Sequence, residues 1–137
     1  MAGGPSIFAA AKYLNKSLRG VNFTTPTEFY VALCTTSSET NLRANNIASA
    51  FEVSGGGYSR KLVTLAQIVE VTPGQVAISV DVDFGTATAS WGTLQQGVLM
   101  DALTGGNVWH FGPLTSPAII NNTDAFLIPA NTFVVNL

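Results

Sequence analysis

Charged residues are scarce in this sequence. Lys and Arg together number six and Asp and Glu eight, so that 10% of the 137 residues are charged, whereas a typical soluble domain carries about 25%. A single cysteine excludes an internal disulfide, so stability must come from packing or assembly. No continuous run of about 20 apolar residues is present, so we expect no membrane span and no membrane partner.

The few charges are unevenly distributed. Three of the six cations lie within residues 1–20, whereas residues 62–137 contain five acidic residues and no basic one. Binding to nucleic acid requires cations that neutralise phosphates, so we expect no nucleic-acid partner. The hydrophobic fraction of 47% is ordinary for a folded domain and excludes disorder.

Residues 6–19 are predicted to form one amphipathic helix, capped by Ser6 and ended by Gly20. The apolar residues share one side: Ile7, Ala11, Leu14 and Leu18. The basic residues share the other: Lys12, Lys16 and Arg19. We expect the apolar side to pack on the domain with the basic side in solvent. In the alternative interpretation, the segment is an arm that docks on a partner.

The remainder of the chain is rich in β-prone segments. These are residues 27–34, 58–72, 75–82, 93–102, 107–112, 117–120, 124–128 and 132–136. Turn signals separate them at intervals of about 8–12 residues, while residues 35–50 read as a long polar loop. The pattern predicts an all-β fold, a single β-sandwich of jelly-roll or Ig-like type with one short N-terminal helix. We divide the chain into an N-terminal helix or arm (1–20) and the β-sandwich domain (21–137).

Few residues could carry out chemistry. His110 is the only histidine, and no G-x-S-x-G nucleophile motif accompanies it. Asp81 and Asp83 would share a strand face, but a calcium site needs about six oxygen ligands. Cys34 is expected to be a packed, inert thiol. We therefore expect no catalytic residue, no metal site and no cofactor.

Two other classes of function stay open. An enzyme would require Asp101 or His110 in a concave pocket beside a partner group. A carbohydrate-binding module would expose Trp91, Trp109 or Tyr58 on one face, where sugars stack on aromatic rings.

Several segments, in order along most of the chain, resemble one protein family. They are LRGVNFTTP (18–26), FYVAL (29–33), EVSGGGYSR (52–60), WGT (91–93), MDALTGGN (100–107), GPLT (112–115) and IPA (128–130). The set resembles small tailed-bacteriophage virion proteins, which are described as tail-fibre or minor virion proteins; similar small β folds serve as capsid cement. The resemblance implies a non-enzymatic structural role in a virion that is assembled in the host bacterial cytoplasm.

The chain is short for a complete fibre and shows no repeat or coiled coil. We therefore expect a homo-oligomeric, capsid-decorating cement protein that stabilises the head shell by contacts to the major capsid protein. The close alternative is a tail-fibre or tail-associated protein that contacts other tail proteins. Charge segregation and the known preference of interfaces for Arg and aromatic residues suggest a partner surface. Its predicted members are Phe8, Lys12, Lys16, Arg19, Arg43 and Trp109.

Overall fold

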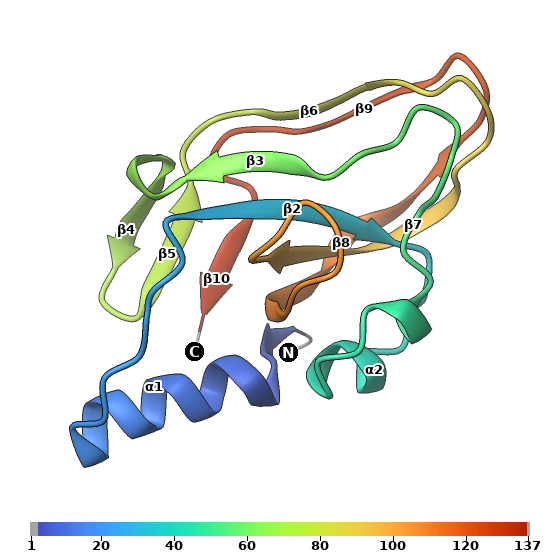
Figure 1. Cartoon of the computed structure of the whole chain (residues 1–137). Helices are drawn as coiled ribbons and strands as arrows, with labels where there is room; N and C mark the ends of the chain where they lie inside the picture. The colour runs from blue at the N-terminus through green and yellow to red at the C-terminus, as the bar shows by residue number, and fades with distance from the viewer. Residues whose placement is uncertain (1–2, 137) are drawn as a thin grey trace.

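The computed structural model describes residues 3–136. Strands account for 43% of the structure and helices for 17%, which confirms the predicted all-β class with a helix near the N-terminus. The strands of the described residues form three sheets (Figure 1). Across residues 3–136, no helix combines the length and the apolar character needed to cross a membrane.

The largest sheet has five antiparallel strands. Their spatial order is β1 (Gly4–Pro5), β8 (Val108–Ile120), β7 (Gly92–Met100), β2 (Glu28–Cys34) and β3 (Lys61–Thr64). The central strands β2 and β7 are buried along most of their length because both faces of this sheet are covered. Strand β8 contains Pro113 and Pro117, which lie beyond the two residues that β1 pairs with.

Two smaller sheets cover one face of the large sheet. One has the order β10 (Val134–Asn136), β5 (Gln75–Ile78) and β4 (Ile68–Thr72), and the other is the ribbon of β6 (Val82–Thr86) and β9 (Ala125–Ile128). The main core joins all three sheets, with Leu33, Ile78 and Leu94 each at most 2% exposed. This arrangement allows short strands with one apolar face to share a single core.

The opposite face of the large sheet is covered by the segment expected to be a long loop. This segment contains the helix α2 (Thr40–Arg43) and a 3-10 turn, η1 (Ala48–Ala50). Leu42 and Ala50 are fully buried there against Val98 and Met100 of the sheet. The loop prediction was therefore wrong for this part, because a few buried residues among many polar ones leave no periodic pattern.

Several strand boundaries also differ from the sequence prediction. The predicted strand 75–82 ends at Ile78 as β5, and Val82 begins β6 in another sheet. The β-prone run 58–72 is divided into β3 and β4 by the 3-10 turn η2 (Leu65–Gln67). Thr64 and Gln67 form a capping box at this turn, which locally replaces the strand ladder. The segments 107–112 and 117–120 belong to one strand, β8.

The helix α1 (Ile7–Arg19) has the predicted caps. The Ser6 side chain accepts a hydrogen bond from the amide of Ala9, and Gly20 adopts the left-handed conformation with φ 66°. Strand β1 precedes the helix and pairs with β8, and Ala9 is fully buried in the main core. Residues 4–9 thus contact the β body directly, and the division of the chain at residue 20 stays a prediction.

Arg60 links two of the motifs that carry the family resemblance. It is 7% exposed, and its Nε and Nη2 each donate at 2.8 Å to an oxygen of the Glu52 carboxylate. Its Nη1 donates to the backbone carbonyls of Ala102 and Gly105 at 2.7 and 2.8 Å. One buried guanidinium therefore holds the loop before β3 against the turn after β7.

Tyr58 and Trp91 attach the same loop to the core. The Tyr58 hydroxyl donates to the Glu52 carboxylate and accepts from the amide of Leu33 in β2 at 3.0 Å. Trp91 Nε1 donates to the carbonyl of Gly56 at 2.9 Å. A Cβ at Gly56, where φ is 60°, would lie 2.9 Å from a backbone carbonyl oxygen, so this position requires glycine.

We predict that Arg60→Ala lowers the free energy of unfolding by about 3 kcal/mol, because it leaves the Glu52 carboxylate without its buried cation. Urea denaturation of the full chain measures this loss. The neighbouring Lys61→Ala, which removes a partly exposed cation, serves as the matched control and should change stability by less than about 0.5 kcal/mol. The double variant Arg60→Ala/Glu52→Ala should cost less than the sum of the single variants; strict additivity would contradict the coupling.

Candidate interaction surfaces

Trp109 of β8 anchors α1 to the β body. Its side chain lies in the interior, and the ring of Phe8 meets it edge-on with centroids 5.5 Å apart. Phe29 of β2 lies at 5.7 Å, and Tyr13 and Phe23 each lie at 6.0 Å. Aromatic side chains bury large apolar areas, so this cluster fixes the helix against the beginning of β8.

Polar contacts fix the same orientation of the helix. The amide of Ser6, which is fully buried, donates to the Trp109 carbonyl at 3.0 Å. Ala9, one turn further along the helix, is buried in the core. Tyr13, one turn beyond Ala9, shares a hydrogen bond of 2.7 Å between its hydroxyl and Nε2 of His110. The inner face of α1 is therefore defined by these residues together with the aromatic cluster.

The aliphatic side of α1 faces away from the body. Ile7 is 67% exposed, Leu14 57% and Leu18 78%. The expectation that this side packs on the domain was wrong. Phe8 and Tyr13, which sequence periodicity did not distinguish from the aliphatic set, bring larger apolar surfaces to the docking contact. The aliphatic side is thus left free for another contact.

The three cations of α1 are held by neighbouring groups. Lys12 Nζ lies 5.3 Å from the ring centroid of Phe8 and 5.9 Å from that of Phe23. Lys16 donates to the side-chain oxygen of Asn22. Arg19 Nη1 donates to the side-chain oxygen of Asn15, one turn earlier, at 2.8 Å. These contacts within the chain orient the basic residues across the surface of the helix.

Arg43 lies apart from α1, on α2. Its guanidinium lies 5.0 Å from the ring centroid of Phe111 and 3.5 Å from the carboxylate of Glu39. Of the six predicted partner residues, the structure brings Phe8, Lys12 and Trp109 together, and Trp109 lies in the interior. Whether the six contact a partner stays a prediction. Sequence analysis missed the aromatic partners of Trp109, which come from segments distant in sequence.

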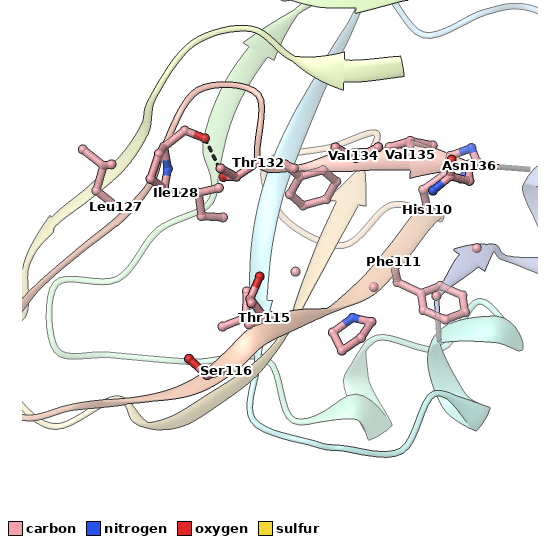
Figure 2. Close-up of a pocket in the computed structure, with 18 of the residues that line it drawn as sticks. His110, Phe111, Thr115, Ser116, Leu127, Ile128, Thr132, Val134, Val135 and Asn136 are labelled. Atoms are coloured by element: carbon pink, nitrogen blue, oxygen red, sulfur yellow. Dashed lines mark hydrogen bonds between the residues drawn. The ribbon is translucent and has the colours of Figure 1, made fainter. Parts of the chain in front are cut away.

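A cleft of about 570 Å³ lies between β8 and the segment formed by β9 and β10 (Figure 2). Its lining combines apolar side chains such as Ile128 and Phe133 with the hydroxyl groups of Thr115 and Ser116. Phe133 lies against Gly97 of β7, where a Cβ would be 2.9 Å from the phenyl ring. The cleft follows the edges at which the large and small sheets separate.

His110 is one of the residues that line this cleft. Burial lowers the pKa of His110 to about 4, so the imidazole is neutral at pH 7. Its Nε2 faces Tyr13, and its buried Nδ1 has no hydrogen-bond partner in the described residues. Among residues 3–136, no group of three or more His, Cys, Asp or Glu side chains could hold a metal ion.

The other candidate acid, Asp101, organises a turn. Its carboxylate accepts hydrogen bonds from the amide and side chain of Asn107 and from Trp109 Nε1, at 2.7, 3.0 and 3.1 Å. Burial opposes ionisation, but these hydrogen bonds outweigh it and hold the pKa of Asp101 below its ordinary value. Cys34 is fully buried, which confirms that it is packed in the core, and burial raises the pKa of its thiol to about 12.

The two tryptophans that a carbohydrate-binding module would expose are buried. Trp91 and Trp109 are each 4% exposed, and both indole nitrogens donate hydrogen bonds within the chain. These two side chains therefore do not form the exposed stacking face of that alternative interpretation. Their role in the structure is to pack the core and to hold the turns around it.

The motif residues of this all-β protein hold loops and turns together. Residues 4–136 match the model of the family described as Podophage GP4 fiber I protein gp80, and the chain belongs to this family. The match confirms the resemblance to tailed-bacteriophage virion proteins. A search of the curated proteins finds no match to the chain.

We predict that His110 makes stability depend on pH. The unfolded chain takes up a proton near pH 6.5, whereas the buried imidazole resists protonation down to about pH 4. The unfolded state therefore binds more protons between these values, and stability falls as the pH is lowered through them. Urea denaturation should show a loss of about 2 kcal/mol between about pH 7.5 and pH 5.

His110→Gln is the matched variant, because it removes the titrating group and keeps a polar side chain. Its stability should be nearly independent of pH across the same interval. Asp101 does not interfere, because a carboxylate of lowered pKa loses its contribution only at more acidic pH. An equal pH slope in the wild-type chain and the variant would contradict the assignment to His110.

Proposed function

We propose that this protein is a non-enzymatic structural subunit of a bacteriophage tail fibre, which works as a homo-oligomer in contact with other virion proteins. The match of residues 4–136 to the podophage fibre family carries this proposal. The low charge of the chain supports it, because charged residues are depleted in the cores of protein–protein interfaces.

The roles of the motif residues support the same conclusion. Glu52, Tyr58 and Arg60 bind one another and the backbone of neighbouring segments, and Asp101 holds the turn after β7. These residues are therefore used to make the β body rigid. Rigid surfaces lose little conformational entropy on docking, which suits a subunit that must form stable contacts in an assembly.

The family description favours a fibre over the capsid-decorating role that we first expected from the sequence. Both roles belong to the virion, but they place the protein at different parts of the particle. A cement protein would strengthen the head shell through the major capsid protein. A fibre subunit would instead contact tail proteins and affect how the particle attaches to its host.

Deletion of the gene in the phage that encodes this chain tests the proposal. We expect particles with filled heads of unchanged heat stability, without the fibre density at the tail in electron micrographs, and with adsorption reduced at least about tenfold. Adsorption assays, thermal DNA-release curves and immunogold labelling of the protein measure these three properties. Complementation with the wild-type gene is the control and should restore adsorption.

The opposite pattern would contradict the tail-fibre proposal. If the deletion lowered the temperature of DNA release from the heads while adsorption stayed normal, the protein would be a capsid-decorating subunit. Labelling of the head surface in wild-type particles would lead to the same conclusion.

A further inference from the structure

The aliphatic stripe of α1 is the surface that most clearly lacks a contact within this chain. We propose that this stripe, formed by Ile7, Ala11, Leu14 and Leu18, packs against the same stripe of a second copy of the chain. The proposal deepens the proposed function and rests on its homo-oligomeric part. It names the surface through which two copies associate.

The spacing of the stripe is that of a helix–helix seam. Its four residues are separated by four, three and four positions, which is the alternation of a and d positions in a heptad repeat. All four are exposed on the folded chain. Val21, which directly follows the C-cap, is 47% exposed and extends the apolar surface beyond the helix. Helices with this pattern bury the seam against a partner helix.

The fold prevents the stripe from being covered by its own body. Ala9 lies on the opposite side of α1 and is fully buried, and Tyr13 is held by His110 and Trp109. Rotating the helix to bury Leu14 or Leu18 would expose this inner face and break these contacts. Within residues 3–136 no segment can therefore cover the stripe, and we assign its partner to another molecule (Figure 1 shows α1 below the sheets).

The charge pattern favours a second copy as that partner. The positions that flank the stripe are neutral: Phe8, Ala10, Asn15 and Ser17. The helix contains no acidic residue, and its cations lie off the stripe in contacts with Phe8, Phe23, Asn22 and Asn15. Two identical stripes can therefore meet along the helix without burying a charged residue of α1. The charges nearest to the stripe, Glu39 and Arg43, line a hollow together with Ile7 and are paired with each other. Self-pairing of one patch is also the usual way in which homo-oligomers form.

The body of the protein compensates for the shortness of the seam. A helix of 13 residues covers only about two heptads, and an isolated helix of that length is marginal in water. Here the caps and the aromatic cluster already hold α1 in its helical form. Association therefore does not have to fold the helix, and the conformational cost of binding is low.

Sedimentation velocity of the full chain, from about 1 µM to about 1 mM, tests the proposal. We expect the wild-type chain to form oligomers as its concentration rises. Leu14→Ser/Leu18→Ser should raise the dissociation constant at least about tenfold. At concentrations where the wild-type chain is monomeric, the variant should change the thermal unfolding curve little, because both side chains are exposed. The matched control is Val69→Ser/Val71→Ser, which removes two exposed aliphatic residues from β4 and should leave association unchanged.

Disulfide cross-linking provides an independent measurement. Leu14→Cys introduces an exposed thiol near the middle of the stripe, into a chain whose own Cys34 is fully buried. The middle of the stripe meets its own copy whether the two helices run parallel or antiparallel, so the two thiols come within disulfide reach in both arrangements. Mild oxidation should yield a covalent dimer of Leu14→Cys, and a much lower yield of dimer for the control Val71→Cys on β4.

Three outcomes would overturn the proposal. If the wild-type chain stays monomeric up to the highest concentration, both the self-pairing of the stripe and the homo-oligomeric part of the proposed function are wrong. The assignment to a tail fibre is tested separately, by the deletion experiment on whole particles. Oligomers that survive Leu14→Ser/Leu18→Ser would place the interface elsewhere. Equal cross-linking of Leu14→Cys and Val71→Cys would show that the stripes of two copies do not face each other.

Discussion

The ion pair between Arg60 and Glu52 is the interaction on which the arrangement of the loops depends. A guanidinium has five donors in a fixed plane, and here four of its hydrogen bonds reach one carboxylate and two backbone carbonyls. Burying this cation without the carboxylate would be costly. Because the two partners come from either side of a glycine-rich loop, their pairing closes that loop, and Tyr58 and Trp91 then attach it to the core.

The low content of charged residues also affects the surface of the molecule. With few charged residues available, the chain uses its aromatic residues to attach α1 and leaves aliphatic residues on the outer side. An isolated protein gains little from such a surface, whereas a subunit of an assembly can use it as a contact. The family membership and the exposed stripe thus both support the proposal that this chain works as a subunit of an assembly.

Local signals in the sequence were enough to predict the class of fold and the limits of α1. Ser6 and Gly20 act within one turn of the helix, and their roles follow from the chemistry of capping. The direction in which the helix faces could not be predicted, because it depends on Trp109, about 100 residues away in the chain. The burial of Leu42 in α2 was missed for the same reason. Contacts between distant segments leave no periodic trace in a single sequence.

The two prolines of β8 have a consequence for how copies of this protein can meet. Pro113 and Pro117 lack the amide hydrogen that a neighbouring strand would need, and they lie in the part of β8 that extends past β1. A strand from another molecule could therefore not continue the ladder along that edge. In the homo-oligomer that we propose, this interruption would oppose polymerisation by strand addition and would leave side-chain surfaces to govern how the copies associate.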